Sequence, residues 1–236
     1  MQEQQPVQTY NTADTRAITS DMAKAYLNKV YLWMSASLLV TAGMAVYTAQ
    51  SMEMLTWVSE HMLMVLLGMI GIILVMSFGA RALTAGALGV LLMVFAAVQG
   101  LIFGPILTAY TQESLGITFA CTAGMFGAMA LYGAMTTRDL SGMGRTLMML
   151  LFGLIIAGIV NMFWGNGLFD FIASCVGVVV FALFTAYDTQ RILQEGLLVT
   201  DSNMRSKGAI MGALTLYLDF INLFLYLLRF FGRADD

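Results

Sequence analysis

Two aspartates lie inside long apolar stretches of this sequence, where a charge is costly. Asp219 lies in GALTLYLDFINLFLYLLRFF, twelve residues after Lys207 and ten before Arg229. At 1.5 Å per helical residue these separations are about 18 Å and 15 Å, so Asp219 falls near the middle of a membrane-crossing segment. A central Asp costs about 2.5–3.5 kcal/mol on insertion scales, which makes it a candidate functional residue. Asp188, in FTAYDTQRI, is the second such residue.

Polar side chains accompany both aspartates. One stripe of the last apolar segment carries, at spacings i, i+4, i+7 and i+11, Thr215, Asp219, Asn222 and Tyr226. Thr185 lies three residues before Asp188, on nearly the same helical face. In an otherwise apolar helix such a stripe must face protein or water, so these residues are candidates for an ion path.

If the two carboxyl groups meet, they form a proton switch. Two carboxylates in a low-dielectric site cannot both ionise cheaply, so the pair is expected to share a proton. Once ionised, the pair offers the hard oxygen ligands that Ca²⁺ prefers. Two carboxylates fall short of six to eight ligands, so only transient calcium binding is expected. In the structural alternative each Asp pairs with a neighbouring hydroxyl or with an Arg.

Counting along the chain leaves the two aspartates at different depths. Asp188 is three residues from Arg191, about 4.5 Å, whereas Asp219 is about 18 Å from Lys207. They can meet only if the first helix continues past Arg191 or the second begins beyond the membrane surface. The polar stretch 195–207 allows either arrangement.

The rest of the sequence supplies apolar helices to hold these residues. It has 236 residues, 59% hydrophobic and 11% charged, with a mean hydropathy of +0.81. Soluble domains have roughly 45–50% apolar and about 25% charged residues. Seven stretches reach or come close to the length of about 20 apolar residues that a helix needs to cross a bilayer. They are Val30–Thr48, Met62–Phe78, Leu83–Tyr110, Leu115–Met135, Leu147–Phe163, Phe169–Tyr187 and Ala209–Phe231. We therefore expect an all-α membrane protein, with one seven-helix transmembrane domain over 26–233 after a flexible cytoplasmic tail over 1–25.

Lys and Arg are distributed unevenly along the chain. Nine of the eleven precede the first apolar stretch or follow the second, fourth and sixth, and the alternate connections contain none. Because cytoplasmic loops retain Lys and Arg, the amino terminus is predicted to be cytoplasmic. The exceptions, Arg229 and Arg233, follow the last stretch, which either crosses the membrane or re-enters. Its full spanning length favours crossing.

Other residues carry weaker signals. Gly104 and Pro105, in GLIFGPILTAY, are expected to bend their helix, and a structural kink is favoured over a gating hinge. His61, the single histidine, is interpreted as a solvated residue at a helix end. Cys121 and Cys175 lack Cys or His partners at metal-binding spacing and are interpreted as core residues.

No motif of an enzyme or a nucleic-acid-binding protein occurs in the sequence. A Ser-His-Asp set, HExxH and Walker motifs are missing, as is any basic run that would neutralise phosphates. We therefore expect no enzymatic activity, no cofactor and no nucleic-acid partner. The expected partners are the lipid bilayer, cations and, in one interpretation, another membrane protein.

Four separate motifs closely resemble bacterial members of the Bax inhibitor-1 family, also called transmembrane Bax-inhibitor-motif proteins. They are GLIFGPILTAY, TAGMFGAMALYGAMTTRDLSGMG, FTAYDTQRI and GALTLYLDFINLFLYLLRFFG. The likeness runs from about Ala25 to Arg233. It implies a seven-helix bundle of the bacterial inner membrane, with the last helix central and the other six around it.

The resemblance also implies a pH-sensitive leak of Ca²⁺ controlled by two aspartates. These match Asp188 in YDTQ and Asp219 in LYLDFIN. The family's gate includes a basic residue on the second helix, and the nearest candidate here is Arg81, at the end of that helix. The cell-death function of animal relatives is not expected of a bacterial-type chain.

Two functions are therefore expected from the sequence. The first is a pH-sensitive cation leak channel, with calcium as the permeant ion and the two aspartates as the gate. The second is an inner-membrane interaction protein that binds or modulates a membrane protease or quality-control partner. The channel requires flux through the purified protein alone, whereas the interaction protein requires only co-purification with a partner.

Overall fold

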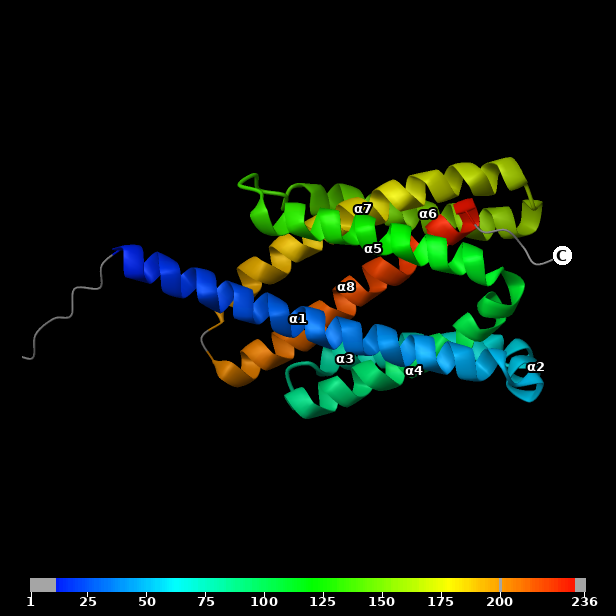
Figure 1. The fold of residues 1–236 in the computed structure, drawn as a ribbon, viewed down its shortest axis with the longest axis horizontal. Coiled ribbons are helices and arrows are strands. Elements are labelled where there is room, and N and C mark those ends of the chain that lie inside the picture. The colour runs from blue at the N-terminus through cyan, green and yellow to red at the C-terminus, as the bar shows by residue number, and fades with distance from the viewer. Residues whose placement is uncertain (1–11, 200, 232–236) are drawn as a thin grey trace, which may run out of the picture.

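Seven long helices form where the apolar stretches were predicted. The computed structural model describes residues 12–199 and 201–231, with side chains from residue 21 on. The helices are α1 (Thr12–Ala49), α3 (Met62–Gly79), α4 (Ala85–Ala109), α5 (Gln112–Met135), α6 (Met143–Trp164), α7 (Gly167–Leu198) and α8 (Ser202–Phe231) (Figure 1). Each contains a segment long and apolar enough to cross a membrane. The predicted all-α membrane bundle is confirmed.

Several helices extend beyond their apolar stretches. Helix α1 begins at Thr12, so residues 12–25, predicted as part of a flexible tail, are helical, and residues 1–11 lie outside the described part of the chain. Helix α7 continues eleven residues past Tyr187. Extending an existing helix adds one hydrogen bond per residue without a new nucleus, so loss of hydrophobicity alone does not end it.

A short helix that the sequence did not predict, α2 (Met52–Glu60), follows α1. Its N-cap is Ser51, whose hydroxyl accepts a hydrogen bond from the Met54 N–H at 3.3 Å. His61 ends it, with the imidazole stacked on Trp57 at a centroid distance of 4.9 Å. At nine residues α2 is too short to span a bilayer, so apolar length did not reveal it.

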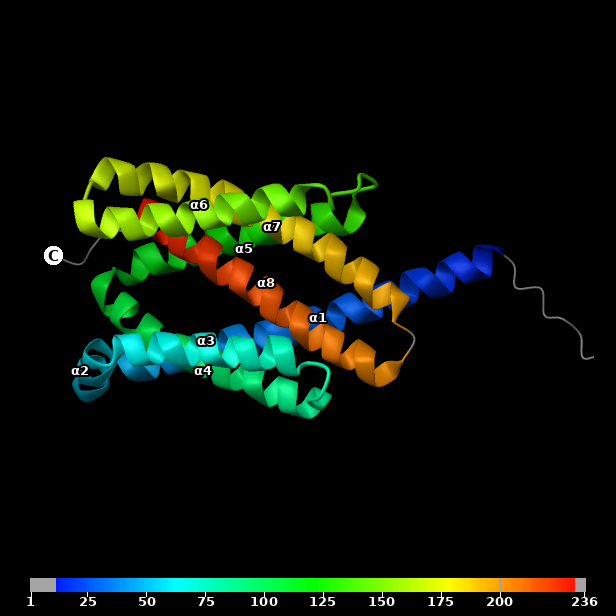
Figure 2. The same ribbon diagram turned by 180° about the vertical axis from the view of Figure 1, so that it is seen from behind.

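Helix α8 is the centre of the bundle. Two-thirds of its apolar span, 67%, is buried inside the protein, against 11–39% in the other six. It packs against α1, α4, α5 and α7, while α3 packs mainly on α4 and α6 on α7 (Figure 2). The central C-terminal helix is therefore confirmed, and the helices around it form an inner layer with α3 and α6 outside.

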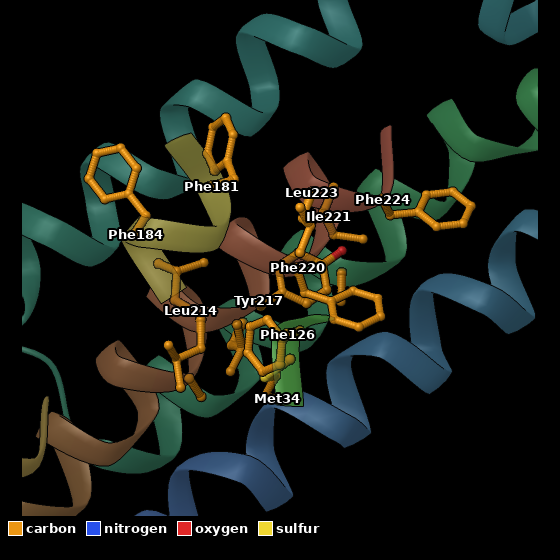
Figure 3. Packing of buried hydrophobic residues seen from close by; sticks show 14 of the residues in the cluster. Met34, Phe126, Phe181, Phe184, Leu214, Tyr217, Phe220, Ile221, Leu223 and Phe224 are labelled. Atoms are coloured by element: carbon orange, nitrogen blue, oxygen red, sulfur yellow. The ribbon is translucent and has the colours of Figure 1, made fainter. Parts of the chain in front are cut away.

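Aromatic side chains of α8 fill the space between the inner helices. The Phe220 ring meets the Phe126 ring edge-on at 5.5 Å (Figure 3). The Phe224 ring stacks on Phe103 at 5.9 Å. Tyr217 is fully buried. Core contacts of α8 therefore reach α4 and α5 directly.

Glycines bring neighbouring helices into contact at several crossings. A Cβ at Gly104 would collide with the Thr48 side chain on α1, and one at Gly133 would collide with the carbonyl of Ala186 on α7. Gly104 therefore serves close packing of α4 on α1. Helix α4 runs unbroken through Pro105 to Ala109, so the hinge proposed at 104–105 remains a prediction.

The connections separate cleanly between the two ends of the bundle. The start of α1 and the α3–α4, α5–α6 and α7–α8 connections share one end, at the left of Figure 1, and the remaining connections and the end of α8 share the other. The basic regions identified in the sequence thus gather at one end. Helix α8 is continuous from Ser202 to Phe231 and runs from the basic end to the opposite end, as the predicted crossing requires.

We expect Gly133→Ala to lower the free energy of unfolding by about 1–3 kcal/mol, because the added methyl group meets backbone on α7. Gly124→Ala is the matched control, since a Cβ at Gly124 on the same helix meets nothing within 4 Å. Thermal unfolding of both purified variants in detergent checks this. Equal Tm values would contradict the close contact between α5 and α7.

The basic end is predicted to be cytoplasmic. With Cys121 and Cys175 replaced by Ala, a cysteine at Thr137 should be shielded from a membrane-impermeant thiol reagent in intact cells. A cysteine at Glu113, near the opposite end, should be labelled. The reverse labelling pattern would show that the basic end faces away from the cytoplasm and contradict the prediction.

Candidate functional site

Helices α7 and α8 form an antiparallel hairpin whose register decides whether the aspartates meet. Small residues mark two crossings: Gly212 lies against Ile192, and Gly177 lies against the Tyr226 ring. The contacts are fourteen residues apart on α8 and fifteen on α7, so the helices run in nearly constant register. In this register the first turn of α8 projects about one turn, roughly 6 Å, beyond the end of α7.

This register brings Asp188 and Asp219 together. Asp188 lies four residues before Ile192 and Asp219 seven residues after Gly212, which leaves an axial offset of three residues, about 4.5 Å. The side chains span that offset, and the two carboxyl groups lie within hydrogen-bonding reach of one another. The first arrangement considered from the sequence occurs, because α7 continues past Arg191 to Leu198. The second, a start of α8 beyond the membrane surface, remains a prediction.

Both aspartates are buried inside the bundle. Asp188 is 6% exposed and Asp219 5%. No donor in the described part of the chain reaches Oδ2 of Asp219. A hydrogen bond between two carboxyl groups requires a proton on one of them, because ionised carboxylates only accept. The geometry therefore suits a pair that holds one proton, or a cation, between its oxygens.

The basic residue that follows the pair most closely along α7 is Arg191, and the gate role of Arg81 remains a prediction. Arg191 lies one turn after Asp188 and forms an ion pair with Glu195 at 2.7 Å, with both side chains 58% exposed. Arg81 is exposed, and its carbonyl oxygen accepts a hydrogen bond from Lys207 Nζ at 3.2 Å. In the residues described, no hydrogen bond or ion pair joins Arg81 to either aspartate.

The Thr and Asn side chains that accompany the two aspartates on α7 and α8 donate hydrogen bonds within their own helices. The Thr185 hydroxyl donates to the Phe181 carbonyl at 2.9 Å, and the Asn222 amide donates to the Leu218 carbonyl at 2.8 Å. Thr215 donates in the same way, to the carbonyl four residues earlier. Such local bonds satisfy the donors while leaving acceptor oxygens available, so an ion-path role remains a prediction.

An ion pair joins α7 and α8 at the end of the hairpin opposite the α7–α8 connection. Arg229 Nη1 lies 3.3 Å from Asp170 Oδ1 at the start of α7, and its guanidinium lies over the Tyr226 ring at 5.7 Å. Arg229, which lies at the end of the bundle opposite most of the other basic residues, thus has a counter-charge in Asp170. Tyr226, predicted on the polar stripe, thus lies beside Arg229 at this end of the hairpin. Arg233 lies outside the described residues.

A residue that the sequence did not single out, Gln190, anchors the loop beside the pair. Its amide oxygen accepts a hydrogen bond from the Leu140 N–H and its amide nitrogen donates to the Arg138 carbonyl, both at 2.8 Å. It thereby fixes the α5–α6 connection to α7, two residues from Asp188. A glutamine close to an aspartate in an apolar helix was the available signal.

A second buried network ties α8 to the other side of the bundle. The Thr41 hydroxyl on α1 lies 2.9 Å from the Ala96 carbonyl on α4 and 2.7 Å from the Tyr217 hydroxyl on α8. The Ser37 carbonyl on α1 lies 3.0 Å from the same hydroxyl and shares its one proton with the Ala96 carbonyl, so Tyr217 donates to Thr41. This single chain of hydrogen bonds links three helices one half-turn away from Asp219.

The carboxyl pair has few additional metal ligands around it. Within the described residues no third His, Cys, Asp or Glu joins it in a metal-binding group. Two carboxylates supply at most four oxygens toward the six to eight that Ca²⁺ takes, so hydroxyls, carbonyls or water would have to complete a calcium shell.

Cys121, predicted as a core residue, is exposed on α5, and Cys175 is half-buried. A small apolar side chain suits a lipid-facing surface as well as a core.

The fold and the site together define a class: a seven-span helical membrane protein built around a C-terminal helix with a buried acidic pair. The chain matches the family model described as inhibitor of apoptosis-promoting Bax1 over residues 23–236. It therefore belongs to the Bax inhibitor-1 family, as the motifs predicted.

Relatives in several bacteria share nearly the full length of the chain. Inner membrane protein YbhL of Escherichia coli is 42% identical over 215 residues, which is 89% of this chain and 92% of that protein. A protein of Deinococcus radiodurans is 38% identical, covering 95% of this chain and 96% of its own length. Protein RP147 of Rickettsia prowazekii is 36% identical, covering 97% and 98%.

Asp219→Ala should lower the free energy of unfolding by about 1–3 kcal/mol, because it leaves the buried Asp188 carboxyl without its partner. Asp219→Asn keeps the shape and an amide donor for Asp188, so its cost should be smaller. Thermal unfolding in detergent, at one pH for all variants, distinguishes them. An Asn variant as unstable as the Ala variant would show that the contact between the two side chains contributes little.

Proposed function

We propose that this protein is a pH-sensitive cation leak channel, with calcium as the permeant ion, gated by the Asp188–Asp219 pair. The observation that carries the proposal is the contact of two buried carboxyl groups across the central hairpin. An inner-membrane location with a cytoplasmic amino terminus is part of the proposal. It is supported by the similarity to YbhL, named as an inner membrane protein, and by the basic end of the bundle.

The proposed gate is a switch between a shared proton and mutual repulsion. With one proton the pair links α7 to α8 by a hydrogen bond. Loss of that proton leaves two like charges, whose repulsion at about 4 Å is on the order of 4 kcal/mol at an effective dielectric constant of 20. That free energy moves a two-state equilibrium most of the way from closed to open. Because α8 contacts four helices, its displacement would loosen the centre of the bundle.

Further polar groups would serve a permeating cation beyond the pair. The buried hydroxyls of Thr118 on α5 and Ser174 on α7 have no hydrogen-bond partner in the described part of the chain. Each lies within about two turns of the amino-terminal end of its helix, at the end of the bundle opposite the basic one. They would offer oxygen ligands to a cation between that end of the bundle and the two aspartates.

Calcium flux into liposomes that contain only this protein should change steeply between roughly pH 6 and pH 8, as the shared proton is lost. Asp219→Asn cannot ionise at this position, so its flux should be nearly independent of pH. Fluorescent calcium-indicator assays at graded pH measure both profiles. The matched control is Asp139→Asn, an exposed carboxylate in the α5–α6 connection, which should keep the wild-type profile.

A wild-type pH profile in Asp219→Asn would exclude the pair as the sensor. Absence of protein-dependent flux at every pH would remove the channel proposal itself. The interaction-protein alternative would then be tested by co-purification with a membrane protease or quality-control partner, which should survive loss of both aspartates.

A further inference from the structure

A groove runs between α1 and α5 with α8 as its floor, where Figure 1 shows α1 and α5 on either side of α8. It consists of two adjoining hollows of about 580 and 220 Å³. They share Leu38 of α1, Phe119 of α5 and Phe220 of α8, so they form one continuous feature, here called the lateral groove. It lies outside the carboxyl pair and the Gln190 network, and Thr41 of the second buried network lines its smaller hollow.

The lateral groove changes character along its length. At the basic end it is lined by polar side chains of α1, namely Lys24, Asn28, Tyr31 and Ser35. Toward the middle the lining is almost entirely apolar, with Phe103, Phe119, Phe220 and Phe224. Among the side chains that the structure describes, Lys24 is the only charged one that lines either hollow. The groove therefore has a cationic, hydrogen-bonding mouth and an apolar interior.

The groove opens sideways out of the bundle at membrane depth. Both flanking helices contain predicted membrane spans, Asp21–Ala49 and Gln112–Met135. On its α5 wall the Phe119 side chain is 53% exposed and Leu131 64%. A Cβ built at Gly127, also on that wall, meets no atom within 4 Å. Lipid therefore has direct access to the groove.

We propose that the lateral groove binds one anionic phospholipid from the leaflet at the basic end. Its phosphate lies at Lys24 and Asn28, and an acyl chain follows the groove toward Phe119 and Phe220. The charge supports this assignment, because a single cation without a lining carboxylate complements a phosphate. The depth supports it as well, because the cationic mouth lies at one end of the spans and the apolar interior toward their middle.

The size of the groove favours an acyl chain over a transmembrane helix. A helix with its side chains is about 10 Å across and rises 1.5 Å per residue, so the two hollows of about 580 and 220 Å³ together accommodate only about seven of its residues. Crossing a bilayer takes about 20. A flexible hydrocarbon chain is thinner, follows an irregular groove and gains contact with the phenylalanine rings.

The proposal is tested by native mass spectrometry of the full chain in detergent, with phosphatidylglycerol and phosphatidylcholine of identical acyl chains as probes. One phosphatidylglycerol should bind about fivefold more tightly than phosphatidylcholine, the ratio expected from one basic residue near an anionic headgroup. Lys24→Gln should abolish this preference, and Lys24→Arg should retain it.

Filling the groove gives a second, independent test. Gly127→Leu places a side chain in the groove and should weaken binding of both lipids at least fivefold. Gly124→Leu is the matched control, because it lies one turn away on α5, outside the lining, with equally open space at its Cβ. Tm values confirm that both variants fold. Equal lipid binding by the two leucine variants, or equal binding of the two lipids by the wild type, would overturn the proposal.

Discussion

A carboxyl group cannot remain exposed to hydrocarbon at low cost, and this constraint organises the bundle around α8. Asp219 lies near the middle of that helix, so α8 has to be surrounded by protein, and its 67% buried span reflects this. Helix α7 supplies the second carboxyl group, and α1, α4 and α5 close the remaining sides. Helices α3 and α6 have no such acidic residue within their spans and lie in the outer layer, where an apolar surface can face lipid.

Close packing around α8 depends on small residues and a few buried hydrogen bonds. Lipid tails are as apolar as leucine, so burying apolar side chains does not by itself drive helices together in a membrane. Contact is achieved where glycines allow close approach, as Gly133 does against Ala186, and where hydroxyls satisfy one another, as Thr41 and Tyr217 do. The two sides of α8 are therefore held differently: hydrogen bonds tie it to α1 and α4, while the acidic pair ties it to α7.

In the proposed mechanism, this difference locates the part of the bundle that responds to protons. The Thr41–Tyr217 link contains no group that ionises near neutral pH, so it holds α8 to α1 and α4 over the physiological range. The Asp188–Asp219 contact is attractive only while a proton is shared. A change in pH would thus act on one interface of the central helix, and the opposite side provides a fixed support. The lateral groove borders α8 on that supported side, with Phe220 adjacent to Asp219 in the chain.

Much of this protein followed from its sequence, because each helix carries its own length, apolar faces and flanking charges. These local properties determined the seven spans, the gathering of basic residues at one end and the identity of Asp188 and Asp219 as the costly groups. The axial shift and rotation of one helix against another depend on side chains from both. Only the tertiary structure decided that the aspartates meet, because crossings at Gly177–Tyr226 and Ile192–Gly212 set the hairpin register. For the same reason it alone revealed the packing role of Gly104, the anchoring by Gln190 and the groove between α1 and α5.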